Sequence, residues 1–175
     1  INMYSEDEGY ALRYNASLAQ PYELGYTSDG GLNWTWTPFP SDVKKVYTIC
    51  FSDKLHGIGF IGKSSYIYLV FTDDGGNTWQ TTSYSWETVS NPIIRYSNSG
   101  NFYAAYSTYY AQSYETHILK STNQGQTWTD IYGPQGGDGN LLSDFKILGD
   151  DLLFMAAVPV NKKKNSLTPG NSLLY

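Results

Sequence analysis

The chain has 175 residues, of which 17% are aromatic, including 17 tyrosines, and only 15% are charged. This composition excludes a disordered or collagen-like chain, and the length allows one compact domain or a modest two-domain protein with a buried core. The formal net charge of −5 and the isoelectric point of about 4.8 disfavour a surface that neutralises phosphates, so no nucleic acid partner is expected.

The N-terminal residues do not form a leader, because Glu6, Asp7 and Glu8 stand where a basic and then apolar segment would be needed. Any signal peptide is therefore expected to have been removed or to lie outside this sequence. No stretch reaches the roughly 18 apolar residues needed to span a bilayer, so no membrane span is expected.

Cysteine and histidine are too few for a metal cluster. Cys50, the only cysteine, lies in an apolar run and is interpreted as a buried structural thiol. His56 and His117 are the only histidines and lie in unrelated contexts. Neither a metal site nor a cofactor is expected.

Three segments of the chain repeat one pattern and are called the repeated turns below. Each has a hydroxyl residue, then Asp or Asn two positions later, Gly two positions after that, and Trp three positions further on. The residues are Thr27, Asp29, Gly31 and Trp34; Thr72, Asp74, Gly76 and Trp79; and Ser121, Asn123, Gly125 and Trp128. The copies begin 45 and 49 residues apart, which fits propeller blades of about 40 to 50 residues.

The chemistry of the repeated turns favours a tight connection between two strands. The Asp or Asn side chain can cap backbone amides of the turn, and Gly supplies the positive φ that the reversal needs. Trp then anchors the outgoing strand. In the third copy Asn123 replaces the Asp and Gln124 replaces a Gly.

The segments around the repeated turns are rich in β-branched, aromatic and small residues, which is typical of strands. Apolar strands are expected at 8–13, 56–62 and 101–106, ahead of each copy, and at 66–71 and 116–120. No segment argues convincingly for a helix, and the one candidate, 141–151, reads equally well as a strand followed by a turn because Gly149 interrupts it.

The repeated turns resemble the Asp-box, or BNR repeat, of sialidases, sortilin-type receptors, some exo-acting glycoside hydrolases and photosystem assembly factors. The apolar strand ahead of each copy makes the sortilin-type and assembly-factor branches the most similar. The resemblance implies an all-β propeller in which the Asp and Trp residues of the turns are structural. It also implies that the ligand-binding face lies on the opposite rim.

Four units of this kind cover the chain, and we expect an all-β fold of propeller blades with four antiparallel strands each. The expected boundaries are a partial blade at 1–38 that begins at its second strand, complete blades at 43–86 and 88–132, and a partial blade at 141–175. The chain is thus interpreted as a fragment of a larger propeller. Alternatively, a second chain completes the end blades.

The candidate ligand-binding residues are aromatic and acidic side chains in two connections opposite the repeated turns. They are Tyr84, Trp86, Glu87, Tyr109, Tyr110 and Tyr114. Aromatic faces beside carboxylates suit sugar rings, although the same rings could fill gaps between blades. The assignment predicts that Trp86 and Tyr110 share one rim, opposite Asp29, Asp74 and Asn123. The basic run 162–164 is interpreted as a solvated loop tip.

This chain alone cannot form a sialidase site, because that family binds its substrate carboxylate with three arginines and this chain has only Arg13 and Arg95. A glycosidase needs two carboxyl groups, for which Glu87, Asp42 and Asp138 are candidates. No Ser-His-Asp grouping is visible.

The leading hypothesis is a non-catalytic Asp-box propeller, secreted, periplasmic or on the cell surface, that serves as a binding or assembly scaffold for a protein or glycan ligand. Its alternatives are one portion of a glycoside hydrolase with a sialidase-like fold and a carbohydrate-binding module without turnover.

Overall fold

The computed structural model describes residues 1–110, 113–133, 140–148 and 152–159, and within these ranges the chain forms fourteen strands and no helix. The strands are β1 (Asn2–Met3), β2 (Gly9–Tyr14), β3 (Tyr22–Thr27), β4 (Thr35–Pro38), β5 (Val43–Phe51), β6 (Gly57–Lys63), β7 (Tyr66–Thr72), β8 (Gln80–Trp86), β9 (Ser90–Tyr96), β10 (Phe102–Tyr110), β11 (Ser113–Ser121), β12 (Thr129–Tyr132), β13 (Asn140–Leu148) and β14 (Leu152–Pro159).

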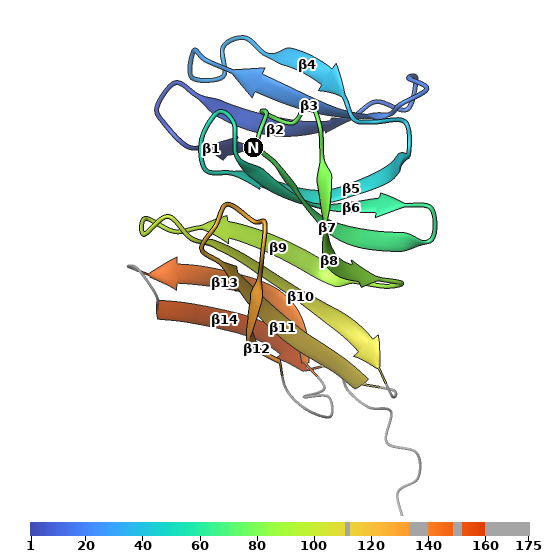
Figure 1. The fold of residues 1–175 in the computed structure, drawn as a ribbon, viewed down its shortest axis with the longest axis vertical. Coiled ribbons are helices and arrows are strands. Elements are labelled where there is room, and N and C mark those ends of the chain that lie inside the picture. Colours follow the sequence, from blue (N-terminus) through green and yellow to red (C-terminus); the bar gives the residue numbers. More distant parts are fainter. Residues whose placement is uncertain (111–112, 134–139, 149–151, 160–175) are drawn as a thin grey trace, which may run out of the picture.

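These strands form antiparallel sheets in which each strand pairs with its neighbours in the chain. The first sheet is β1–β4, the second β5–β8 and the third β9–β12, and β13 pairs with β14 in a fourth (Figure 1). The predicted all-β fold of four-stranded blades is thereby confirmed, and the chain is a partial β-propeller.

The structure adds a first strand that the sequence analysis did not expect, and it decides between helix and strand for the segment around 141–151. The first sheet was expected to begin at its second strand, yet β1 pairs Asn2 with Tyr10 and Met3 with Gly9 and supplies a short first strand. Its two residues are too few to give a period, so the sequence carried no signal for it. The segment around 141–151 contains the strand β13, with a register shift between Leu142 and Asp144, and no helix within the described part of it.

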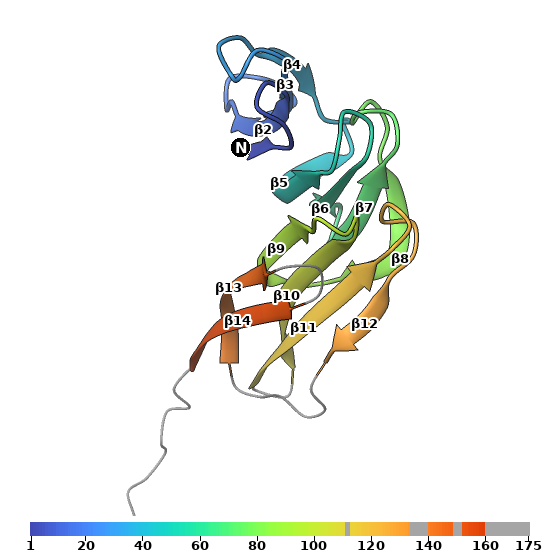
Figure 2. The same cartoon turned by 90° about the vertical axis from the view of Figure 1, so that its left-hand side faces the viewer.

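The sheets follow one another in a row, each packed face to face on the next (Figures 1 and 2). Apolar side chains that alternate along the strands fill the space between neighbouring sheets. The buried members of the three layers are Tyr10, Leu24, Phe39, Val43, Val46, Phe51, Ile61, Val70 and Trp79 between the first and second sheets; Cys50, Ile58, Phe60, Ile67, Leu69, Ile94, Phe102, Ala104, Tyr106 and Leu119 between the second and third; and Tyr103, Ala105, Ile118, Leu142 and Phe145 between the third and fourth.

Cys50 belongs to the second of these layers. Its thiol is buried as expected, and burial raises its pKa to about 12. A thiol with so high a pKa is not a nucleophile at neutral pH.

The register of the strands gives the molecule two rims. One carries the repeated turns and the connections that follow β1, β5 and β9, and is called the turn rim. The other carries the connections that follow β2, β4, β6, β8 and β10, and is called the loop rim. Trp86 pairs with Ile67 at the start of β7, whereas Asp74 follows the end of that strand. Tyr110 pairs with Ser113 at the β10–β11 connection. The predicted placement of Trp86 and Tyr110 opposite the repeated turns is confirmed.

Candidate functional site

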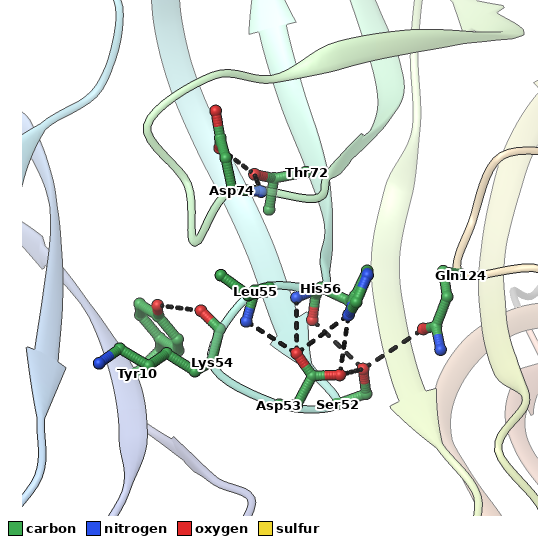
Figure 3. Close-up of polar contacts among 9 residues, drawn as sticks. All are labelled: Tyr10, Ser52, Asp53, Lys54, Leu55, His56, Thr72, Asp74 and Gln124. Carbon is green, nitrogen blue, oxygen red and sulfur yellow. Dashed lines mark hydrogen bonds and ion pairs between the residues drawn. The ribbon is translucent and has the colours of Figure 1, made fainter.

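The repeated turns share a core of hydrogen bonds between the hydroxyl residue, the Asp or Asn and the turn backbone in all three copies. In the second copy the buried hydroxyl of Thr72 accepts from the backbone N–H of Gly76 at 2.9 Å and donates to Asp74 Oδ1 at 2.7 Å. The Asp74 carboxylate then accepts from the Thr78 backbone N–H at 2.9 Å and from the Thr78 hydroxyl at 2.7 Å (Figure 3 draws Thr72 and Asp74). These bonds engage both carboxylate oxygens of Asp74 within the turn.

The first and third copies reproduce this network with different side chains. Asp29 accepts from the backbone N–H of Asn33 at 2.9 Å and from its side-chain amide at 2.7 Å. Asn123 accepts from the Thr127 backbone N–H at 2.9 Å, and its own amide donates to the Thr127 hydroxyl at 2.8 Å. The turn therefore needs the side-chain oxygen and does not depend on a negative charge.

These hydrogen bonds also set the acidity of the two carboxylates. Burial raises the pKa of Asp74, but hydrogen bonds from Thr78, Thr72 and Asn77 outweigh it and hold the pKa below its ordinary value. The backbone N–H and side-chain amide of Asn33 and the hydroxyl of Thr27 lower the pKa of Asp29 in the same way. A carboxyl with a lowered pKa is ionised at neutral pH and is a poor general acid.

The glycine four positions after the hydroxyl residue of each repeated turn has positive φ, and in two copies it packs against the preceding sheet. Its φ is +91° at Gly31, +87° at Gly76 and +85° at Gly125. A Cβ added at Gly76 would overlap Leu24 of the first sheet, and one added at Gly125 would overlap Ile58 of the second. These glycines therefore serve the turn and the packing between sheets together.

Next to the second repeated turn, the connection between β5 and β6 brings a serine, an aspartate and a histidine together (Figure 3). The Asp53 carboxylate accepts from the backbone N–H groups of Leu55 and His56 at 2.7 and 2.9 Å and lies 2.9 Å from His56 Nδ1. Ser52 Oγ lies 3.1 Å from Asp53 Oδ2 and 3.4 Å from Gln124 Oε1 of the third repeated turn.

This cluster does not have the order of a nucleophilic triad. A triad needs the serine hydroxyl on one ring nitrogen and the carboxylate on the other, whereas here both Ser52 and His56 bond the carboxylate of Asp53. In this connection the backbone N–H of Ser52 donates to the C=O of His56. The equivalent connections of the other sheets have the same bond, from Tyr4 N–H to Glu8 C=O and from Ser97 N–H to Asn101 C=O. Asp53 is thus a cap of a turn. The spacing of Asp53 and His56, three residues apart before a strand, was the sequence signal for this cap, and the sequence analysis missed it.

On the loop rim, four of the six candidate residues form two groups on opposite faces of the third sheet. Tyr84 and Trp86, 6.0 Å apart, pack on the layer between the second and third sheets. The Trp86 ring lies 4.5 Å from that of Tyr106 and 5.6 Å from that of Phe60. Both candidates are half-buried, so they combine the gap-filling role with a partly accessible surface.

Tyr109 and Tyr114 form the second group. They are cross-strand partners in β10 and β11, with ring centroids 5.1 Å apart in an edge-to-face arrangement. Tyr109 is 58% exposed. Because neighbouring residues in a strand point to opposite faces, Tyr109 and Tyr106, three residues apart in β10, lie on opposite faces of the sheet. Glu87 is exposed at the end of β8, and the side chain of Tyr110 lies outside the described residues.

Beside Trp86, a histidine lies between two carboxylates on the face that packs on the second sheet. The His117 ring stacks on Tyr106 with centroids 5.2 Å apart and planes 12° apart. Its Nδ1 lies 3.3 Å from Asp130 and its Nε2 lies 3.8 Å from Glu115. Burial, followed by the charge of Asp130, raises the pKa of the Tyr106 hydroxyl. None of these residues was singled out by the sequence analysis except His117.

Of the candidate carboxylates for glycoside hydrolysis, Asp42 is paired with Lys63 at 3.0 Å and Glu87 is exposed. Asp138 lies outside the described residues, as does the basic run 162–164. In the ranges that the structure describes, no group of three or more potential metal ligands occurs, and no helix is long and apolar enough to cross a membrane.

A groove runs along the first strands of the sheets. This groove, of about 630 Å³, is lined by residues of β1, β5 and β9, including Asn2, Thr48 and Arg95. Asn2 Oδ1 accepts from the backbone N–H of Phe51 at 2.6 Å and ties the first two sheets together there. Arg95 donates to Asp144 of the fourth sheet at 3.1 Å. Asn2 and Arg95 of the groove thus each link two neighbouring sheets.

Comparison with known proteins gives a structural likeness alone. No family model matches the chain, and no curated protein matches it. A solved structure described as YCF48 bound to D1 peptide matches with a TM-score of 0.33 and 13% sequence identity, over 89% of this chain and 73% of that one.

Proposed function

We propose that this chain is part of a non-catalytic Asp-box propeller that acts outside the cytoplasm as a binding or assembly scaffold, with a protein or glycan ligand on the loop rim. The observation that carries the proposal is the difference between the side chains of the two rims. The polar side chains of the repeated turns bond within the turns themselves, whereas the loop rim has exposed aromatic rings, among them that of Tyr109 in the Tyr109–Tyr114 pair.

The physical reason is that aromatic rings give a large contact area for little conformational entropy. Tyrosine also adds a hydroxyl that can bond a peptide or a sugar. Tyr109 already packs edge-to-face on Tyr114, and this contact reduces the freedom that its ring would lose on binding. A ligand that covers this pair buries apolar surface that water now touches.

The proposal is tested by screening the whole protein against immobilised glycans and a peptide library, followed by titration of the strongest hit. Tyr109→Ala is expected to weaken that binding roughly three- to tenfold, the loss of about 1 kcal/mol of aromatic contact. Tyr96→Ala, at a half-exposed tyrosine on the turn rim, is the matched control and is expected to leave binding unchanged. Equal effects of the two variants would contradict the assignment of the site.

The same protein incubated with chromogenic glycosides and polysaccharides separates the scaffold from a glycoside hydrolase. No turnover is expected. Turnover that Glu87→Gln abolishes would overturn the scaffold role, because a carboxylate on the loop rim would then be doing chemistry. Saturable glycan binding without product would identify a carbohydrate-binding module as the form the scaffold takes.

A further inference from the structure

The layers between neighbouring sheets each end at the loop rim in a cluster of aromatic side chains, and we call these the rim clusters. Strand parity and packing assign each ring to its layer. The first cluster is Tyr14, Tyr22, Tyr66 and Tyr68, between the first and second sheets; the second is Tyr84 and Trp86, between the second and third; and the third is Tyr109 and Tyr114, between the third and fourth. The connections that carry them follow one another along one edge of the molecule (Figure 1).

The first rim cluster is built like the tyrosine pair of β10 and β11, with exposed rings that rest on less exposed ones. Tyr14 is 62% exposed and pairs across β2 and β3 with Tyr22, their ring centroids 5.1 Å apart in an edge-to-face arrangement. Tyr66 is 43% exposed, and its ring centroid lies 6.4 Å from that of Tyr68 in the same strand. Tyr22 and Tyr68 both pack on the layer between the first and second sheets. The two exposed rings therefore stand at one end of that layer, one from each sheet.

The second rim cluster has carboxylates beside its rings. His117 stacks on Tyr106, the ring neighbour of Trp86. The Glu115 carboxylate lies 3.8 Å from His117 Nε2, which is beyond hydrogen-bond distance, and the side chain of Asp130 is 42% exposed. Both carboxylates can therefore accept a hydrogen bond from a hydroxyl group of a ligand that covers Trp86.

The rings of the rim clusters are not copies of one position in the repeat. Positions are compared by counting from the residue that pairs with the hydroxyl residue of each repeated turn. Tyr14 then corresponds to Gly62 in the second sheet and Ser107 in the third, and Tyr109 corresponds to Ser64 in the second. Aromatic rings from unrelated positions thus meet at the same end of each layer, which the repeat by itself does not require.

The charged side chains around the rim clusters give no field of a single sign. Lys63, the strand partner of Tyr66, is paired with Asp42 at 3.0 Å, and Arg13 is paired with Glu23 at 2.7 Å. Other charged side chains of the described rim are Lys44, Lys45, Glu87 and Glu115. A rim of mixed charge attracts neither a polyanion nor a polycation, so its rings favour a neutral ligand.

The spacing of the rim clusters fits a ligand with a repeating unit. Sheets that pack face to face stand about 10 Å apart, so the clusters recur at about that interval along the rim. A linear polysaccharide presents identical ring faces at a fixed repeat, and the C–H groups of such a face pack on the electron-rich face of an aromatic ring. A peptide of mixed sequence offers no such repeat.

We propose that the loop rim binds a neutral, linear polysaccharide that crosses neighbouring blades and stacks one of its sugar rings at each rim cluster. This inference rests on the proposed binding role of the loop rim and names its ligand. Each cluster binds one sugar ring weakly. Because the rings belong to one chain, the second and third contacts are intramolecular, and affinity rises with the length of the chain.

Titration calorimetry of the whole protein with size-graded neutral oligosaccharides tests the proposal. The probes are linear glucans, xylans and mannans, each from the disaccharide to chains long enough to cross two junctions between blades. For the series that binds, affinity is expected to rise at least roughly tenfold from the shortest to the longest chain. Equal affinity for short and long chains, or no binding in any series, would overturn the proposal.

Substitutions in separate clusters show whether one chain contacts them together. Tyr14→Ala and Tyr109→Ala are each expected to weaken binding of the longest chain roughly three- to tenfold, and their combination to remove most of the gain with chain length. Tyr14→Phe keeps the ring and is expected to bind like the wild type, as is Tyr96→Ala on the turn rim. A long chain whose affinity responds to Tyr109→Ala alone would be confined to one cluster and would contradict the proposal.

Other probes separate the failure of this inference from the failure of the proposed function. A peptide whose binding depends on Tyr109, found while no oligosaccharide series binds, would leave the loop rim as the binding face and overturn the polysaccharide. Binding of heparin or polygalacturonate that salt abolishes would assign an anionic ligand and would also overturn it. Absence of binding by every probe, peptides included, would contradict both.

Discussion

At the residue scale, the third repeated turn is a natural substitution, because Asn123 accepts the backbone hydrogen bond that Asp29 and Asp74 accept in the other two copies. Replacing Asp74 by Ala removes an acceptor from the Thr78 backbone N–H and is expected to lower the free energy of unfolding by about 1–2 kcal/mol. Asp74→Asn keeps the acceptor oxygen and is expected to cost less than half of that. Urea unfolding monitored by tryptophan fluorescence measures both, and equal losses would show that charge and not geometry holds the turn.

Gln124 is the second departure in that turn. It adopts φ of +57°, where the other copies have Gly30 at +70° and Gly75 at +74°. A side chain in this region costs about 1 kcal/mol relative to glycine. Gln124→Gly is therefore expected to raise the free energy of unfolding by roughly 0.5–1 kcal/mol, less the weak contact with Ser52. Gln124→Ala, which keeps the strained φ, is the control and should bring no gain in chemical denaturation.

At the element scale, the contact between each repeated turn and the preceding sheet should be the most sensitive point of the packing. Gly125→Ala would place a Cβ on Ile58 and is expected to cost at least about 2 kcal/mol, the sum of overpacking and backbone strain. Gly100→Ala has nearly the same φ, +86°, without the neighbour, and should cost only the strain. Combining Gly125→Ala with Ile58→Val should recover part of the loss. Additive losses in thermal unfolding would refute a direct clash.

The aromatic residues of the loop rim should behave according to the face they occupy. Trp86 packs on Tyr106 and Phe60, so Trp86→Ala is expected to lower the free energy of unfolding by about 3 kcal/mol. Tyr109→Ala removes a mostly exposed ring and should stay within about 0.5 kcal/mol of the wild type. Calorimetry on both variants checks the difference, and a large loss for Tyr109→Ala would place that ring in the core.

At the scale of the whole molecule, the carboxylates of the turn rim link stability to pH. The pKa values of Asp29, Asp53 and Asp74 lie below their ordinary value in the folded chain. A group whose pKa is lowered on folding contributes stability above its unfolded pKa, and that contribution is lost as pH falls through the folded pKa. We expect the urea midpoint to fall below pH 4 and to fall less in a variant that carries Asp29→Asn and Asp74→Asn. Identical acid profiles would exclude these groups.

The sequence predicted the local features of this molecule better than the long-range ones. The repeated turns were recognisable because Thr72, Asp74 and Gly76 bond to one another within five residues, and the flanking strands followed from period-two patterns. The contact of Gly76 with Leu24 spans 52 residues and leaves no local signal. The division of Trp86 and Tyr109 between two faces depends on strand parity, which needs the exact register. The hydrogen bonds of the turns are thus encoded by residues that are close in the sequence. The packing between blades depends on pairs of residues that are far apart in the sequence and that only the fold brings together.

The missing side chain at Gly76 and Gly125 has a consequence for building with this repeat. At each junction an aliphatic side chain of one blade fills the space that the missing Cβ leaves in the next blade. The two aliphatic side chains come from different positions, because Leu24 lies in the third strand of its sheet and Ile58 in the second. Blades taken from this chain and joined in a new order would therefore place these side chains away from the glycines that they have to meet. A ring of identical copies would need one junction chosen and the other redesigned.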